Sequence, residues 1–232
     1  ERDDKGVKQD NSYIFQDLKI ASCGEKYMSM QGQYPVITLT LKGAKQPDFE
    51  MAYEVLRDDI YVEFARHIYV LESDALLAED RAAFEAVLGK KASAAEFATS
   101  LKLLSRCLKA YFRKDVIILI DEYDVPLENA YFQGFYDEMA GFIRSLFESA
   151  LKTNPCLEFA VVTGCLRISR ESIFTGLNNL EVHSVLDGKF ADCFGFTEDE
   201  VQKLTDDYDV SGQMPTIKKW YDGYRFGDKE IY

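Results

Sequence analysis

The chain has 232 residues, of which 47% are apolar and 29% charged, and this composition is typical of a globular protein with an ample core. Its net charge of −13 argues against broad, sequence-independent binding of nucleic acid. No apolar run approaches the roughly 20 residues of a membrane span and no signal peptide opens the chain, so we expect neither nucleic acid nor a membrane among its direct partners.

A strand and a long helix are the first elements that the sequence predicts. Residues 34–41 (YPVITLTL) are rich in β-branched residues, and Pro35 suits the start of a strand, where a missing N–H matters least. Asp48 can cap a helix that extends to about Leu71, because apolar residues recur there at spacings of three and four.

Two further helices are expected before the next strand. The first is short and covers residues 80–88. Ser93 and Glu96 then form a capping box, the pattern that opens a helix by satisfying backbone N–H groups reciprocally. The helix that follows ends in Arg113 and Lys114, whose positive charges are favourable at a helix C-terminus.

The most informative stretch is residues 116–124, which read VIILIDEYD. Its apolar run fits a strand covered on both faces, and the carboxylates of Asp121, Glu122 and Asp124 then belong at the open C-terminal edge of a sheet. An apolar strand followed by Asp-Glu is typical of the Walker B motif of nucleotide hydrolases, in which the Asp holds Mg²⁺ and the Glu orients water. A buried strand that ends in an acidic loop is the alternative interpretation.

The second half of the chain continues the alternation of helices and strands. A loop after Pro126 is expected to lead to a helix over residues 131–152, and residues 157–163 (LEFAVVT) predict the next strand. Right-handed crossovers between these strands give an α/β fold, a parallel sheet with helices on both faces.

The C-terminal part reads as a separate, smaller unit. Residues 182–186 are a candidate strand, and Thr197 and Glu200 form a second capping box that opens a short helix. We place the boundary near residue 187, so that a core domain spans 1–187 and a small helical subdomain begins at 188–232.

The five cysteines and two histidines suggest no metal or disulfide framework. The cysteines are odd in number without a C-x-x-C pair, and His67 and His183 lie far from them in sequence. We expect free, mostly buried thiols in a reducing cytoplasm, which is where we place the protein, and two structural histidines.

A phosphate-binding loop is missing from this sequence. Such a loop requires G-x-x-x-x-G-K-[ST], and the nearest text, residues 88–92 (LGKKA), lacks the first glycine and the hydroxyl residue. Because the P-loop strand precedes the Walker B strand in nucleotide hydrolases, we expect a segment ahead of Glu1 to carry it.

Four stretches together resemble a bacterial AAA-ATPase-like family, whose members commonly continue into a PD-(D/E)XK nuclease-like domain. They occur in order as VIILIDEYDVPL (116–127), VTGCLRISRESIFTGLNNLEV (162–182), FGFTEDEV (194–201) and WYDGYRF (220–226). The resemblance implies a P-loop NTPase fold, a nuclease-like domain beyond Tyr232, and ATP and Mg²⁺ as ligands of the full-length protein. The C-terminal subdomain would be the start of a helical lid.

The same resemblance implies roles for the acidic residues and for the end of the following strand. Asp121 would be the Mg²⁺-side acid and Glu122 the catalytic base for water. Asp124 is expected to close a turn through its own backbone, with a contact to the cofactor as the alternative. Thr163 and Gly164 would lie at the sensor position near the γ-phosphate, although Thr163 is equally an ordinary strand residue.

Arg167 is the expected source of positive charge at this edge. It falls inside the family's LRI string, and an Arg here could stabilise a transferring phosphoryl group in its own subunit or in a neighbour's, which would require a homo-oligomer. A solvated or ion-paired Arg is the alternative, and Arg170 is a second candidate. We expect the pair Asn178 and Asn179 to shape a turn, with a role of the two amides in a functional loop as the alternative.

These features predict the core of a Mg-dependent AAA-like ATPase module that is incompetent alone for want of its P-loop. The alternative is a non-hydrolysing interaction module with a degenerate NTPase fold, which scaffolds a neighbouring nuclease-like domain. A nuclease site within this segment is disfavoured, because Glu158 in the strand after Asp121 is not followed by the required Lys.

Overall fold

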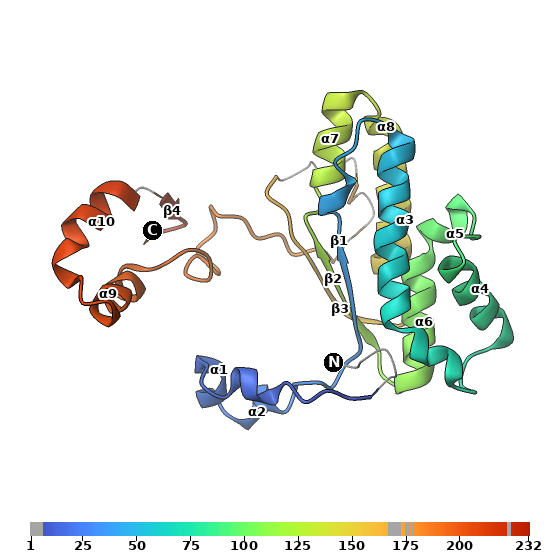
Figure 1. Ribbon diagram of the computed structural model, residues 1–232, viewed down its shortest axis with the longest axis horizontal. Helices are drawn as coiled ribbons and strands as arrows, with labels where there is room; N and C mark the ends of the chain where they lie inside the picture. Colours follow the sequence, from blue (N-terminus) through green and yellow to red (C-terminus); the bar gives the residue numbers. More distant parts are fainter. Residues whose placement is uncertain (1–6, 167–172, 175–176, 178, 222–223) are drawn as a thin grey trace. The chain divides into compact units, whose positions relative to one another are not determined.

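The computed structural model describes residues 7–166, 173–174, 177, 179–221 and 224–232. At its centre lie three parallel strands in the order β1-β2-β3 (Figure 1). Their bounds are Val36–Thr40 for β1, Val116–Asp121 for β2 and Leu157–Val162 for β3. The predicted α/β class and all three predicted core strands are therefore confirmed, with the acidic stretch on the central strand.

The connection from β1 to β2 is helical, as predicted, and its caps lie where the sequence places them. The Asp48 side chain accepts a hydrogen bond from the backbone N–H of Met51, and Ser93 and Glu96 form both bonds of the capping box. The helix expected after Ser93 is interrupted at Thr99. The elements are η2 (Lys42–Ala44), α3 (Phe49–Arg66), η3 (Ile68–Glu72), α4 (Ala78–Leu88), α5 (Ala94–Ala98) and α6 (Ser100–Phe112).

The connection from β2 to β3 differs from the expected loop and single helix. It contains α7 (Val125–Gln133), α8 (Tyr136–Phe147) and a π-helical turn, η4 (Glu148–Lys152). Pro126 does not prevent a helix, because it lies in the first turn of α7, where its missing N–H has no intrahelical partner to lose. Gly134, with φ 87°, then ends α7 in the left-handed conformation.

Within the first unit, the expectation of helices on both faces of the sheet is wrong for the part that the structure describes. Helices α3, α6 and α8 lie on one face, against which β2 buries Val116, Ile118 and Ile120 (Figure 1). On the other face Phe159 remains 61% exposed, and Leu119 is exposed as well. The reason is the strand order: two right-handed crossovers that progress in the same direction place both helical connections on the same face.

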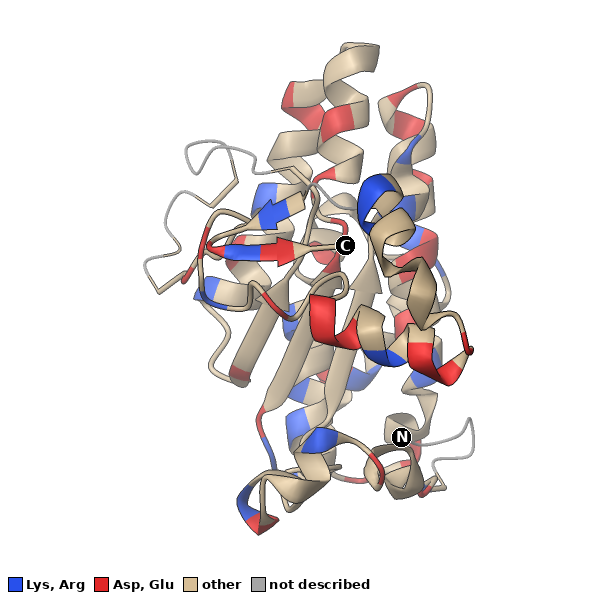
Figure 2. Ribbon diagram, turned by 90° about the vertical axis from the view of Figure 1, so that its left-hand side faces the viewer, with Lys and Arg blue, Asp and Glu red and all other residues tan. Residues whose placement is uncertain are grey.

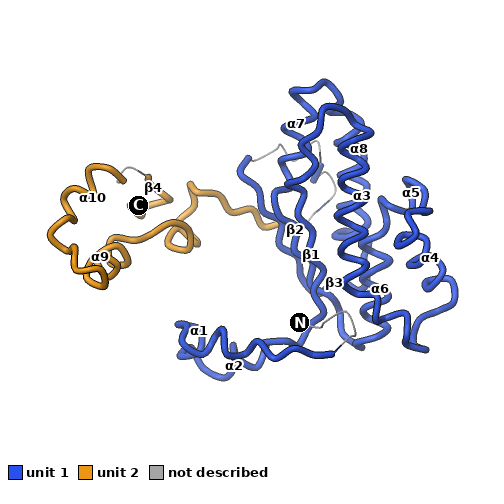
Figure 3. Tube along the Cα trace, in the orientation of Figure 1, with its two compact units in different colours: residues 1–177 blue, residues 178–232 orange. Residues whose placement is uncertain are grey.

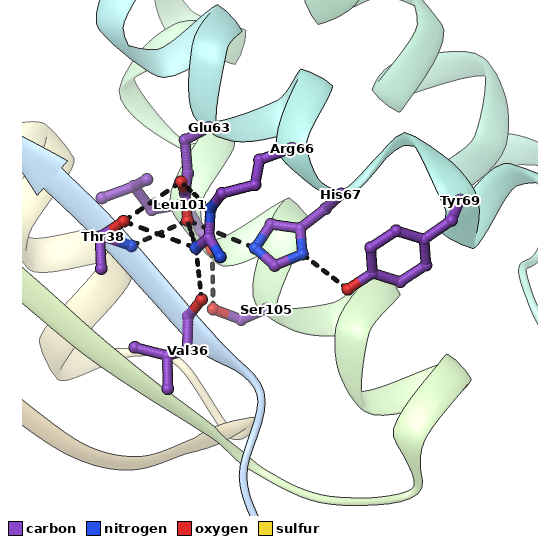
Figure 4. A network of polar contacts seen from close by, with 8 residues as sticks. All are labelled: Val36, Thr38, Glu63, Arg66, His67, Tyr69, Leu101 and Ser105. Carbon is purple, nitrogen blue, oxygen red and sulfur yellow. Dashed lines mark hydrogen bonds and ion pairs between the residues drawn. The ribbon is translucent and has the colours of Figure 1, made fainter. Parts of the chain in front are cut away.

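A buried polar network fastens α3 to Val36 and Thr38 of β1 (Figure 4). Glu63 is 4% exposed; its Oε1 accepts a bond of 2.8 Å from the backbone N–H of Thr38, and both its oxygens accept bonds from Arg66. His67 lies 3.3 Å from Glu63 through Nε2, and its Nδ1 is 2.9 Å from the Tyr69 hydroxyl. The expected structural role of His67 fits this position.

The network sets the protonation of Glu63. Burial by itself would raise the pKa of this carboxyl, but hydrogen bonds from His67 and Arg66, together with the Arg66 charge, lower the pKa below its ordinary value. The charged carboxylate is therefore the form that the fold favours.

The chain divides into two compact units, Glu1–Leu177 and Asn178–Tyr232 (Figure 3). The first unit opens with η1 (Ser12–Phe15), α1 (Lys19–Ser22) and α2 (Glu25–Met28), none of which contains a buried residue. None of the described helices is long and apolar enough to cross a lipid bilayer.

The described residues of the second unit form two α-helices, a 3₁₀ turn and a β-hairpin. The predicted capping box of Thr197 and Glu200 is present at the start of its first helix. The strand expected over residues 182–186 does not form; the described strands here are an antiparallel pair in the aromatic C-terminal stretch. The elements are α9 (Glu198–Asp207), η5 (Ser211–Gln213), α10 (Met214–Tyr221), β4 (Tyr224–Phe226) and β5 (Lys229–Ile231).

Candidate functional site

The candidate site lies at the carboxyl ends of the three parallel strands, where Asp121, Glu122 and Asp124 form what we call the acidic edge. Asp121 is the last residue of β2, and its carbonyl accepts a bond of 3.0 Å from the backbone N–H of Leu41 beyond β1. On the other side, the N–H of Thr163 beyond β3 donates to the carbonyl of Ile120 at 2.8 Å. The acidic edge is therefore held by backbone bonds from both neighbouring strands.

The Asp121 side chain is oriented by two hydrogen bonds to the same oxygen. Thr163 donates its hydroxyl to Oδ1 of Asp121, and the backbone N–H of Glu122 donates to that oxygen at 3.0 Å. Oδ2 is the oxygen that remains for a ligand, on a residue that is exposed at the edge of the sheet. Asp121 and Thr163 are both residues that the sequence singles out. The structure brings them together although they lie 42 positions apart in the chain.

Glu122 adopts an unusual backbone conformation. Its φ of 54° lies in the left-handed region, which residues other than glycine occupy infrequently and at a cost of about 1 kcal/mol or more. The bonds on either side fix this turn: the N–H of Tyr123 donates to the carbonyl of Thr163 at 3.1 Å, and the N–H of Val125 to that of Glu122 at 3.2 Å. The chain reverses sharply here, and the half-buried Glu122 side chain follows directly after Asp121.

Asp124 connects the start of α7 with the segment that leaves β3. It is 2% exposed, and its Oδ2 accepts a bond of 2.6 Å from the backbone N–H of Leu166. The carbonyl of Asp124 accepts a bond of 2.8 Å from the N–H of Glu128, which opens α7, so Asp124 lies at the N-cap of this helix. The other carboxylate oxygen, Oδ1, is buried and has no hydrogen-bond partner in the described part of the chain.

Gly164 permits this connection by its lack of a side chain. A Cβ at this position would lie 2.5 Å from Oδ1 of Asp124 and 2.7 Å from Cε1 of Tyr123. The Tyr123 ring fills this space because its hydroxyl donates to the carbonyl of Leu166 at 2.9 Å. Gly164 therefore has a steric reason to be glycine, whatever it contacts in a ligand.

Two residues of the site were not singled out from the sequence. Thr40 lies directly opposite Asp121 in the β1–β2 register, and Tyr123 packs against Phe174 with ring centroids 5.2 Å apart. A threonine at the end of a predicted neighbouring strand is a signal that could have identified Thr40. Tyr123 gave no such signal, because its side chain contacts Leu166 and Phe174, which lie more than forty residues away in the sequence.

Three of the predicted residues cannot be placed. Arg167, Arg170 and Asn178 lie outside the described residues.

The donor set of the acidic edge suits a hard cation bound together with phosphate. Carboxylate and hydroxyl oxygens are the ligands that Mg²⁺ prefers, and Mg²⁺ is commonly held by one or two carboxylates plus substrate phosphates and water. The described residues contain no group of three or more His, Cys, Asp or Glu side chains placed to hold a metal by themselves. Asp121 can therefore contribute to a shared Mg²⁺ site, while the acidic edge is not a complete protein cage.

The cysteines are free, as expected, but fewer of them are buried than predicted. Cys107 and Cys156 are buried, whereas Cys23, Cys165 and Cys193 are exposed. Burial is the main cause that raises the pKa of Cys107 to about 12, so this thiol is inert at neutral pH.

The chain is similar to known proteins over part of its length. A protein of Azotobacter chroococcum mcd 1, described as an uncharacterized protein in the vnfD 5' region, is 30% identical over 118 residues. The match covers 50% of this chain and only 23% of that relative. No solved structure matches the chain. A family model described as a predicted AAA-ATPase matches residues 4–174, well over half of the sequence, and the chain therefore belongs to this predicted AAA-ATPase family.

Proposed function

We propose that the chain is the core of a magnesium-dependent AAA-like ATPase module. The observation that carries this proposal is the hydrogen bond from Thr163 to Asp121 across the ends of two adjacent parallel strands, with Glu122 directly after Asp121. A Walker B acid beside a polar sensor residue has this arrangement. Mg²⁺ bound together with ATP supplies Lewis-acid polarisation of the phosphoryl oxygens.

Each residue of the acidic edge then has a separate role. Oδ2 of Asp121 would be the oxygen that holds the metal, because Oδ1 accepts hydrogen bonds from Thr163 and from the backbone. Glu122 orients the attacking water and accepts its proton. Asp124 holds the main chain at Leu166, two residues after Gly164.

The proposal requires a phosphate cradle from outside this sequence, since the chain has no G-x-x-x-x-G-K-[ST]. The parent coding sequence upstream of Glu1 should therefore encode an apolar strand followed by that motif. A parent sequence without it would overturn the ATPase function.

The decisive variant is Glu122→Gln in the full-length protein. Loss of the carboxylate removes the group that accepts the proton of water, so phosphate release should fall by at least a hundredfold while ATP remains bound. Phosphate release and binding of a fluorescent ATP analogue measure the two effects. Glu79→Gln, an exposed residue of α4, is the matched control and should leave both unchanged. Unchanged turnover in Glu122→Gln would remove Glu122 from this role.

The second candidate is a non-hydrolysing interaction module that scaffolds a neighbouring nuclease-like domain. The uncovered apolar side chains of the sheet, such as Phe159 and Leu119, favour it, because such a face suits contact with another protein surface. Calorimetric titration of the full-length protein with Mg²⁺ and ATP separates the two functions. Absence of nucleotide binding would favour the scaffold.

A further inference from the structure

Helix α7, which begins directly after the acidic edge, presents aromatic side chains to solvent. Tyr131 is 71% and Phe132 74% exposed, although Leu127 and Ala130 of the same helix are fully buried. The exposed rings contact one another, with centroids of Tyr131 and Phe132 5.7 Å apart, and Tyr136 lies 6.3 Å from Tyr131. The aromatic face of α7 is therefore a cluster of rings and not a single exposed residue.

These rings line an open groove of about 420 Å³, which we call the α7 groove. Its described lining is almost entirely apolar, with Glu128 the one charged residue among the described residues that line it. Clustered Tyr and Phe in an exposed apolar hollow are characteristic of the centre of an interaction surface. The groove is lined by Leu127, Glu128, Tyr131, Phe132, Tyr136 and Leu166.

Among the residues that the structure describes, the α7 groove and the start of α8 carry acidic side chains. Between Val116 and Ile143 the chain contains six carboxylates and no Lys or Arg, whereas both signs are interspersed over the molecule as a whole (Figure 2). Of these acids, Glu128 lines the groove, and Asp137 and Glu138 are exposed next to Tyr136 at the start of α8. An occupant with positive charge around an apolar face is complementary to this surface.

We propose that the α7 groove binds a basic amphipathic helical segment of a partner protein. One or two large apolar side chains of that segment enter the α7 groove and pack against Tyr131 and Phe132, and its Lys or Arg residues pair with Glu128 and with the acids at the start of α8. An amphipathic helix in an apolar groove is a recurrent mode of peptide recognition. The proposal stands apart from ATP hydrolysis, because it requires no nucleotide.

Two other occupants fit the surface less well. A nucleic acid would bring its phosphates against the carboxylates that surround the groove. A second copy of the chain carries a net charge of −13 and would meet repulsion at an acidic surface.

The test uses designed peptides of about sixteen residues, long enough for helix formation. The probe has Leu and Phe at helical spacings with Lys elsewhere. Its two controls are a scrambled sequence of the same composition and a peptide with Glu in place of Lys. Fluorescence anisotropy against the complete 232-residue chain should show binding of the probe alone. The affinity should fall as salt rises toward about 1 M, where charges are screened within roughly 3 Å.

Variants of the chain locate the binding surface. Phe132→Ser and Glu128→Lys should each weaken binding of the probe at least tenfold, the first by removing the apolar contact and the second by reversing charge. Val62→Ser on α3 (63% exposed) and Glu79→Lys are the matched controls and should leave the affinity unchanged. Circular dichroism and thermal unfolding verify that all four variants fold.

Several outcomes would overturn the proposal. These are equal binding of all three peptides, no binding of any, or binding that survives both groove variants. Sedimentation of the chain alone adds a further one: self-association that Phe132→Ser abolishes would make the groove an interface between copies of the chain.

Discussion

At the scale of single residues, the addition of one methyl group at Gly164 should lower the stability of the fold. A methyl group there meets Asp124 and the Tyr123 ring at distances that van der Waals contact forbids, so either the backbone or both side chains must move. Gly164→Ala should lower the free energy of unfolding by about 1–3 kcal/mol, measured by urea denaturation.

Gly141 provides the matched control for this substitution. It lies within α8, and a Cβ there would have no neighbour within 4 Å. Gly141→Ala should therefore stabilise the chain by up to about 1 kcal/mol, since alanine favours the helix. Equal effects of the two substitutions would show that the space at Gly164 is not restricted.

Because of Glu63, the stability of the folded chain should fall as the pH is lowered. Its pKa is lowered in the folded chain by His67 and Arg66, so the ionised carboxylate contributes stability above the ordinary pKa of 4.5. That contribution is lost as the pH falls through the lower pKa of the folded state. Glu63→Gln should cost about 1–3 kcal/mol at pH 7, because charged hydrogen bonds to Arg66 are lost.

The cost of Glu63→Gln should then shrink as the pH falls below about 4.5, where the wild type loses the same contribution. Urea unfolding of both proteins between pH 7 and pH 3 measures this difference. Glu79→Gln changes an exposed position, so its difference in free energy of unfolding from the wild type should not change with pH. If the free energy of unfolding lost in Glu63→Gln were the same at every pH, Glu63 would act through packing and not through its charge.

At the scale of elements, the two faces of the sheet differ in how much stability they contribute. Ile118→Ala removes a side chain that is fully buried under the helices and should cost about 2–5 kcal/mol. Phe159→Ala removes a larger side chain from the uncovered face and should cost under about 1 kcal/mol. The comparison uses urea unfolding of the same chain, and a Phe159 cost equal to that of Ile118 would show that the face is covered in solution.

Local patterns in the sequence predicted the elements that depend on local causes. Ser93 and Thr197 open helices because the capping box is a short-range device, and β2 follows from an apolar run that suits a buried strand. Helix α7 was not predicted because proline disfavours the interior of a helix. Pro126 lies in the first turn of α7, where a missing N–H removes no hydrogen bond.

Such local patterns could not predict that the helices cover one face of the described sheet and leave the other uncovered. It depends on the spatial order of the three strands, which no stretch of sequence contains. The same limit applies to the site. Asp121 and Glu122 are visible as adjacent letters, whereas the bond from Leu166 to Asp124 joins positions 42 apart.

At the scale of the whole molecule, the family match and the compact units divide the chain at nearly the same place. The family model ends at residue 174, and the first unit ends at Leu177. The acidic edge, the α7 groove and the Glu63 network all belong to this first unit. The predicted lid therefore falls in the second unit, beyond the family match, and stays a prediction.

The outer side of β3 has a consequence for the handling of this protein. In the described sheet β3 pairs only with β2, so its other side presents an unsatisfied row of N–H and C=O groups. Its sequence, LEFAVV, contains one charge and no proline, and such a strand is a template onto which an extended chain can add. Solutions of this chain should therefore tend toward intermolecular strand addition as concentration rises, unless another strand pairs with β3.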